Sequence, residues 1–423
     1  MLILDLEQQR SKAGSQLNSL RDPMARLPRE IQSHIFLDVE PSLHRALTDP
    51  DNNPLVLLRV CRLWRVIALS TPRLWTDLSM ISLPRSANYT LLCREWMERA
   101  RPHHLSLTLE GSLVLDYSVQ TLMTQYEDRI QSLTLKLDDS LNSRLSRMIR
   151  LQVDALFPAL QALKIMPQDC GDMHLHTIDD LLDVLRAAPY ISHCMIYNML
   201  FREETEHWEE FPLLTIASLE QFELQDPLRF MSLQVTRSSA AILRYLTLPA
   251  LKHITLTDFD ITHDELVAFF SRSSAPLRSL DISMQTIWDD LHVDQLLRLM
   301  PSLTALHLYA VYNSNSRFQA FVDILGTELV VLPDLRVLRL SADSDHSTPI
   351  DYEGLIRMLN IRRTSCATRL ECFELYFATD FAPLGFDLPL LSSGVKSALQ
   401  QLVTDGLEVH VIHVDDERKN LLD

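Results

Sequence analysis

A six-residue pattern returns nine times along this chain of 423 residues. Each copy has apolar residues at its first, fourth and sixth positions, as in IQSLTL at 130 and LRVLRL at 335. The copies begin at residues 130, 160, 191, 219, 251, 277, 303, 335 and 370, with intervals of 26 to 35 residues. Such regularity predicts one small structural unit that is repeated along the chain.

The second half of each copy alternates apolar and polar residues, which predicts a short half-buried strand. The segments between copies instead show helical spacing, as in DELVAFFSRS at 264 and FQAFVDILGTEL at 318. Proline supports this phasing, because it cannot continue a helix and favours an extended predecessor. Five prolines lie two residues before the first apolar residue of a copy: Pro158, Pro189, Pro249, Pro301 and Pro333.

A single strand and helix of this length cannot bury their own apolar faces, so stacked neighbours must do so. We therefore expect an α/β fold with a parallel sheet that is lined by helices. The pattern resembles the leucine-rich repeat family, which implies a horseshoe-shaped solenoid with its strands on the concave side. This resemblance covers residues 102–414 and leaves residues 415–423 as a polar tail. The asparagine that the family carries after each strand is missing here, so we expect less regular loops but an intact sheet.

The stretch PLVLLRVCRLWRVIALSTPRLW, residues 54–75, has apolar residues at helical spacing. Leu57, Cys61, Trp64 and Ala68 fall on one side of a helix and the arginines on the other, which is typical of a core helix. The preceding stretch RLPREIQSHIFLDV, residues 26–39, predicts a second helix that begins near a proline and carries Ile31 and Ile35 on one face.

A helix led by leucine and proline, then V-C-x-x-W, then the closing pair Leu74 and Trp75, together resemble an F-box. The resemblance covers residues 26–80, with a long connection at residues 40–54 of a kind seen in fungal members, and residues 1–25 form an N-terminal helix and linker. It implies a short helical module that docks on the Skp-type adaptor of a cullin-RING ubiquitin ligase. The implied adaptor-binding residues are Leu27, Pro28, Ile31, Ile35, Leu58, Val60 and Trp64.

Side chains between and just after the apolar positions of each strand project to the open side of the sheet, because side chains alternate along a strand. This face is either an ordinary solvated surface or a recognition surface for a protein substrate. Exposed tyrosines favour recognition, since aromatic side chains often anchor protein contacts. The candidate substrate-binding residues are Tyr197, Glu223, His253, Asp281, His307, Tyr309, Arg339 and Tyr376.

The formal net charge of −17 disfavours binding to nucleic acid, whose phosphates an acidic surface repels. Arg59, Arg62 and Arg65 form the strongest basic group, and we interpret them as the solvated face of a helix. No apolar run is long enough for an ordinary membrane span. Six scattered cysteines and the lack of a secretory signal favour reduced thiols in the cytoplasm or nucleus.

No enzyme signature is present. The sequence lacks GxGxxG, GxxxxGK and GxSxG motifs and holds only eight glycines, so we expect no catalytic residues and no cofactor. Cys170, His174 and His176 come nearest to a metal-ligand set, but Cys194 is expected to point into the core and we expect no metal site.

Two functions remain open on these grounds, and an enzyme is the weakest third. The chain is either the substrate receptor of an SCF-type ubiquitin ligase or a repeat scaffold whose N-terminal helices only cap the solenoid.

Overall fold

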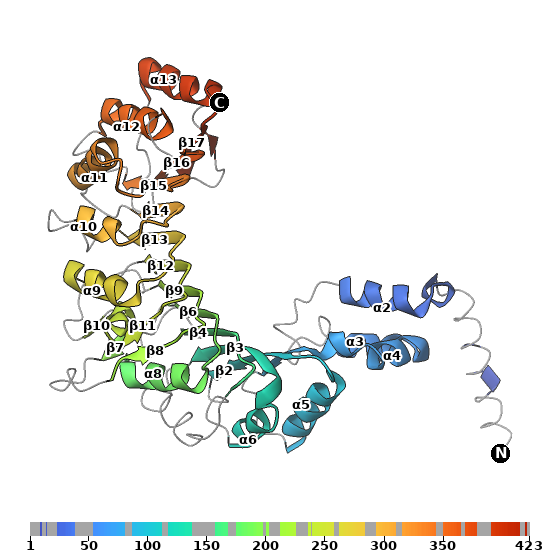
Figure 1. The fold of residues 1–423 in the computed structure, drawn as a ribbon. Coiled ribbons are helices and arrows are strands. Elements are labelled where there is room, and N and C mark those ends of the chain that lie inside the picture. Colours follow the sequence, from blue (N-terminus) through green and yellow to red (C-terminus); the bar gives the residue numbers. More distant parts are fainter. Residues whose placement is uncertain are drawn as a thin grey trace. The chain divides into compact units, whose positions relative to one another are not determined.

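A computed structural model describes the fold of this chain in two compact units, residues 1–138 and 139–423 (Figure 1). The described residues are 9–10, 14, 23–38, 54–80, 87–111, 117–137, 157–167, 175–197, 200–202, 212–225, 236–237, 239–257, 262–283, 293–309, 315–343, 350–364, 369–378, 391–414 and 419–420. Each unit is α/β, and each has parallel strands that alternate with helices.

The first unit begins with helices and continues as strands and helices. Its helical part comprises η1 (Pro23–Arg26), α2 (Arg29–Asp38), α3 (Pro54–Val60), α4 (Arg62–Leu69) and η3 (Pro72–Trp75). Its mixed part comprises β1 (Asp77–Met80), α5 (Ala87–Arg99), β2 (Leu105–Glu110), α6 (Tyr117–Gln125), η5 (Glu127–Arg129) and β3 (Ile130–Leu137). Strand β2 pairs in parallel with both β1 and β3.

The single helix expected from Leu57 to Ala68 is wrong, because two helices, α3 and α4, divide at Cys61. Cys61 has an extended backbone, with φ −157° and ψ 172°, and its sulfur accepts a hydrogen bond from the Trp64 N–H at 3.4 Å. Cys61 therefore acts as the N-cap of α4, which satisfies an amide that the first turn of a helix leaves unpaired. The break changes which side chains share a face on either side of it.

Two tryptophans join the helical part of this unit to its strands. The rings of Trp75 and Trp96 are fully buried and meet edge to face, with centroids 4.9 Å apart. The indole N–H of Trp75 donates to the Ala68 carbonyl at 2.9 Å, and that of Trp96 donates to the Asp77 carbonyl at 3.1 Å. Because β1 and α5 share this core, the structure adds a strand–helix pair ahead of residue 102.

The second unit repeats strand and helix along its length. Its main strands are β4 (Ala162–Pro167), β6 (His193–Tyr197), β9 (Gln221–Gln225), β12 (His253–Thr257), β13 (Ser279–Ser283), β14 (Ala305–Tyr309), β15 (Val337–Asp343), β16 (Cys372–Ala378) and β17 (Glu408–Val414). Its helices are α8 (Ile178–Ala187), η8 (Ser239–Tyr245), α9 (His263–Ser273), α10 (Val293–Arg298), α11 (Asn315–Thr327), α12 (Tyr352–Thr364) and α13 (Ser393–Thr404). Short strands complete it: β5 (Leu175–Thr177), β7 (Leu200–Arg202), β8 (Leu214–Thr215), β10 (Thr236–Arg237), β11 (Leu246–Thr247) and β18 (Lys419–Asn420).

The nine main strands of this unit are parallel and keep their register from one strand to the next. The nine copies of the sequence pattern form strands, as predicted: the copy at 130 forms β3 of the first unit, and the other eight form the main strands of this unit from β4 to β16. Their fourth and sixth residues are buried, as Leu306 and Leu308 are. Helices α9 to α13 line one side of these strands (Figure 1). We call the opposite side of the sheet in the second unit the sheet face.

The predicted role of proline is confirmed. Each of the five prolines occupies the second position of a tight turn that precedes a strand. The turn around Pro301 is closed by a hydrogen bond from the Leu303 N–H to the Met300 carbonyl at 3.1 Å, and the turn around Pro189 by one from Ile191 to Ala188 at 3.2 Å. Proline suits this position because its fixed φ angle matches the turn.

Backbone carbonyls link successive repeats where an asparagine ladder is missing. Between the copy at 160 and that at 370, the carbonyl at the second position of one copy accepts two N–H groups from the copy that follows it. Glu220, for example, accepts from Lys252 at 2.8 Å and His253 at 3.0 Å. The sheet is therefore regular without asparagine, as expected from the sequence.

Arginines close the helix ends on the other side of the sheet. The guanidinium of Arg362, on α12, is buried and donates to the carbonyls of Leu325, Glu328 and Leu332 at 2.7 to 3.1 Å, around the end of α11. Arg272 on α9 donates in the same way to carbonyls at the end of η8. The carbonyls of Glu328 and Leu332 also accept backbone N–H groups, from Val331 at 3.1 Å and Leu335 at 3.3 Å, so a fixed guanidinium fork joins several carbonyls at once.

We predict that Arg362→Ala lowers the free energy of unfolding by about 3 kcal/mol, because it removes a buried guanidinium and its hydrogen bonds to three carbonyls. Arg357→Ala, on the exposed side of the same helix, is the matched control and is expected to change it by less than about 0.5 kcal/mol. Urea unfolding followed by circular dichroism measures both. Equal unfolding midpoints for the two variants would show that Arg362 does not hold the repeats together.

Candidate functional site

The first candidate surface is an apolar row along α2. Leu27 lies just ahead of the helix, four residues before Ile31, and Ile31 and Ile35 lie four residues apart on one side of α2. Their exposed fractions are 37%, 46% and 37%. Phe36 faces the other way and is buried. Three large apolar side chains in line on a helix surface are a feature of protein-binding sites.

A buried glutamine fixes the start of this row. The side-chain amide of Gln32 donates to the carbonyls of Met24 at 2.5 Å and Leu27 at 2.8 Å, which ties η1 to α2. The hydroxyl of Thr71 lies 3.1 Å from that of Ser33 and joins α2 to the segment after α4. Pro28 is exposed beside the row. The row is therefore held by polar contacts beneath it rather than by its own burial.

Helices α3 and α4 carry further exposed apolar residues. Val60 is 52% exposed, while Leu58 on the same helix is half-buried. Val66 and Leu69 on α4 are also exposed, at 46% and 41%. Sequence reasoning missed these two residues because it interpreted the arginine side of this helix as solvated. Their i, i+3 spacing beside Arg62 and Arg65 was the available signal.

Trp64 lies between the helices rather than on their surface. Its ring packs on Phe36 with centroids 5.1 Å apart, and it is half-buried. Its indole N–H is buried and has no acceptor among the described residues. Trp64 therefore lies beneath the exposed apolar residues of these helices, where it holds α4 against α2.

The second candidate surface is the sheet face, where register aligns side chains from different repeats into rows. One row follows Glu223, Thr255, Asp281, His307, Arg339 and Glu374 across six neighbouring strands. Tyr197, Tyr309 and Tyr376 lie one row further along their strands, and His253 lies one row before. The structure thus brings the eight candidate substrate-binding residues to one face.

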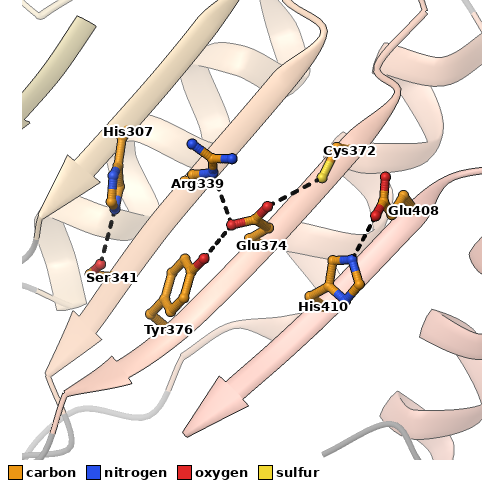
Figure 2. Close-up of polar contacts among 8 residues, drawn as sticks. All are labelled: His307, Arg339, Ser341, Cys372, Glu374, Tyr376, Glu408 and His410. Carbon is orange, nitrogen blue, oxygen red and sulfur yellow. Dashed lines mark hydrogen bonds and ion pairs between the residues drawn. The ribbon is translucent and has the colours of Figure 1, made fainter. Parts of the chain in front are cut away.

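A glutamate is the centre of a polar cluster on β15 and β16 (Figure 2). Glu374 accepts a hydrogen bond from the Arg339 guanidinium at 2.9 Å and another from the Tyr376 hydroxyl. Burial raises the pKa of Glu374, but these hydrogen bonds outweigh it and hold the pKa below its ordinary value. Glu374 is therefore ionised beside Arg339, and its hydrogen bond with Tyr376 fixes the tyrosine ring over the sheet.

His307 lies beside this cluster as a neutral aromatic group. Its ring is 3.9 Å from that of Tyr309 between centroids, and its Nε2 is 3.4 Å from the Ser341 hydroxyl (Figure 2). Burial, reinforced by the charge of Arg339, lowers the pKa of His307 to about 4. The imidazole is uncharged at neutral pH and offers a flat surface rather than a cation.

A similar cluster lies on strands β4, β6 and β9. The hydroxyl of Tyr197 donates to Glu223 at 2.6 Å, and the amide of Gln221 donates to the other carboxylate oxygen at 2.5 Å. Burial and Glu223 raise the pKa of Tyr197. The ammonium of Lys164 lies 5.0 Å from the centre of the Tyr197 ring, a cation–π contact. In both clusters a tyrosine is thus fixed by a hydrogen bond from its hydroxyl to a glutamate.

Asp281 and His253 lie between the two clusters. The Asp281 side chain is half-buried and makes no hydrogen bond or ion pair with any residue that the structure describes. Burial raises the pKa of Asp281, Arg339 opposes this, and Glu223 adds to it. His253 is exposed on the neighbouring strand.

The cysteines on described strands are poor nucleophiles and poor metal ligands. Cys194 is fully buried, as expected, and burial raises its pKa to about 12. Burial and the carboxylates of Glu374 and Glu408 raise the pKa of Cys372 to about 12. Within the described ranges no three His, Cys, Asp or Glu side chains are placed to hold a metal ion. Cys170 and His174 lie outside those ranges.

No known protein family matches this sequence, and no curated protein matches it. In the parts of the chain that the structure describes, no helix is long and apolar enough to cross a membrane.

We predict that His307 titrates near pH 4 in the folded chain, well below the ordinary histidine pKa of 6.5. Because the folded-state pKa is lowered, the contribution of His307 to stability is complete above pH 6.5 and is lost as the pH falls through 4. NMR of histidine-labelled chain measures the titration, and His307→Gln should remove this part of the pH dependence of unfolding. Arg339→Gln should raise the pKa, and a wild-type value near 6.5 would contradict the buried arrangement.

Proposed function

We propose that this chain is the substrate-recognition subunit of an SCF-type ubiquitin ligase. In this proposal its F-box helices bind the Skp-type adaptor, and a leucine-rich-repeat solenoid binds a protein substrate. The observation that carries the proposal is the exposed apolar row Leu27, Ile31 and Ile35, which lies where the F-box resemblance puts its adaptor-binding residues.

The apolar row is suited to a partner helix. Helix-in-groove recognition uses apolar side chains at intervals of three and four residues on a helix face. The side chains of the row are partly in water, so contact with an adaptor removes apolar surface from water and stabilises the complex. Val60, Val66 and Leu69 extend the apolar surface available on the neighbouring helices.

The repeating strands support the proposed solenoid. Nine parallel strands in register, five of them preceded by a turn with proline at its second position, are consistent with a leucine-rich-repeat array. The loops lack the family asparagine, and backbone carbonyls supply the link between repeats. In the proposed horseshoe the sheet face is the concave surface.

The proposed mechanism is proximity rather than catalysis by this chain. The receptor holds a substrate on its sheet face while its F-box holds the ligase, which raises the effective concentration of the substrate near the charged ubiquitin carrier. The bonds are made and broken by other subunits, so the chain needs no catalytic residue or cofactor. Its proposed location is the cytoplasm or nucleus.

One observation favours a second function. Trp75 and Trp96 join the helical part of the first unit to its strands in a single core. Such packing is what a solenoid cap requires, because the first repeat otherwise exposes an apolar end. The alternative is a leucine-rich-repeat scaffold that binds proteins without taking part in a ubiquitin ligase.

Adaptor binding separates the two functions. We predict that the full chain co-purifies with a Skp-type adaptor and that the double variant Leu27→Asp, Ile31→Asp loses the adaptor, with affinity reduced at least about 100-fold. Since both side chains are exposed, the melting temperature of the variant should stay close to that of the wild type. Pull-down and calorimetry measure the two effects.

Leu91→Asp, on the exposed side of α5 in the same unit, is the matched control and should bind the adaptor as wild type does. A wild-type chain that fails to bind the adaptor, or a double variant that binds it normally, would favour the scaffold.

A further inference from the structure

Four carboxylates whose side chains the structure describes lie on the sheet face, and three of them have donors from the chain itself. Glu223 accepts from Tyr197 and Gln221, and Glu374 accepts from Arg339 and Tyr376. Glu408 lies 2.9 Å from His410. The fourth is Asp281, for which the described residues supply no hydrogen bond or ion pair. A half-buried carboxylate without a donor among the described residues is a place where a donor from outside adds an interaction.

The neighbours of Asp281 leave this position open to a cation. The side chains in register with it, Thr255 on one side and His307 on the other, carry no charge at neutral pH. The nearest charges in the row are Glu223 and Arg339, each two strands away, or about 10 Å from backbone to backbone. Arg339 is already paired with Glu374. Glu223 and Asp281 therefore lie on either side of Thr255 with no bonded cation between them among the described residues.

The chain's own cations show what this face accepts. Lys164 lies over the ring of Tyr197, whose hydroxyl is bonded to Glu223. Arg339 lies against Glu374, which holds Tyr376 (Figure 2). The face thus holds one cation on a tyrosine ring and one on a glutamate, on either side of Asp281 along the row. At Asp281 itself no bonded cation is found among the described residues.

The electrostatics favour the same ligand. Burial, the largest effect, and Glu223 disfavour the charged form of Asp281, while Arg339 and His253 favour it, and together they raise its pKa. The carboxylate therefore gains more from a positive partner than a fully hydrated one does. The chain as a whole carries a formal net charge of −17, which attracts basic partners over distance. A basic side chain placed over Thr255 reaches toward both carboxylates.

We propose that the sheet face binds a basic segment of a partner protein, and that a lysine or arginine of this segment lies over Thr255 between Glu223 and Asp281. This assignment rests on the substrate-binding role of the face under the proposed function and names the substrate class as proteins with an exposed basic segment. Tyr197 and Tyr309, which lie one row further along their strands, flank the segment.

The test compares two variants of equal net charge. A short fluorescent peptide of lysine, arginine, glycine and serine is titrated with the full chain, and binding is followed by fluorescence anisotropy at low salt. Glu223→Gln with Asp281→Asn removes two charges from the sheet face. Asp264→Asn with Glu353→Gln removes two exposed charges from helices α9 and α12.

The sheet-face variant is expected to bind the peptide at least about tenfold more weakly than the wild type, which corresponds to about 1.4 kcal/mol. The helix variant is expected to stay within about twofold of wild type, because only long-range charge is lost. Matched melting temperatures confirm that both variants are folded. An acidic peptide of the same length is expected not to bind.

Equal weakening in the two variants would overturn the proposal, since it would mean that the peptide responds to net charge alone. Undetectable binding of the peptide to the wild-type chain would overturn it as well. Adaptor co-purification keeps this result separate from the proposed function: the sheet-face variant is expected to retain the adaptor. A chain that binds the basic peptide through Asp281 but no adaptor would overturn the ligase role and leave the basic ligand in place.

Discussion

A backbone carbonyl that accepts two N–H groups from the next repeat is the contact on which the rest of the second unit depends. It occurs from the copy at 160 to the copy at 370, with Glu220 and its donors Lys252 and His253 as one instance. Because both partners are backbone, the link does not depend on which side chain occupies the position. Proline turns precede five of these copies, and arginines such as Arg362 close the helix ends on the far side. Register across the sheet follows, and with it the rows of side chains on the sheet face.

The repeat was predictable because burial imposes its own period on the sequence. Alternating apolar residues located all nine strands, and the prolines located the turns before five of them. The break at Cys61 was not predictable in the same way, since Leu57, Trp64 and Ala68 fit one continuous helix equally well. The strand at Leu78 and Met80 was missed because only two of its residues carry the apolar signal, and its burial depends on Trp75 and Trp96.

The two candidate surfaces differ in what the sequence could reveal. Alternation along a strand is local, so the sequence placed Glu223, Asp281 and Arg339 on one face. Which of them are paired depends on register between residues far apart in the chain, and only the structure shows that Arg339 bonds Glu374 and that Asp281 has no bonded donor among the described residues. Likewise, helical spacing found Ile31 and Ile35, while Val66 and Leu69 were missed because they lie on the side of α4 that the arginines marked as solvated.

Because the strands keep their register, the geometry of the sheet face does not depend on the lengths of the loops between them. The intervals between copies vary from 26 to 35 residues, yet neighbouring strands pair in the same register throughout the second unit. Loops can therefore lengthen or shorten on the helix side without moving Asp281 relative to Glu223. What sets their separation is the count of intervening repeats. Loss of the whole repeat that carries Thr255 would bring the two acids onto adjacent strands and close the space for a cation, whereas an insertion of similar length within a loop would leave that space unchanged.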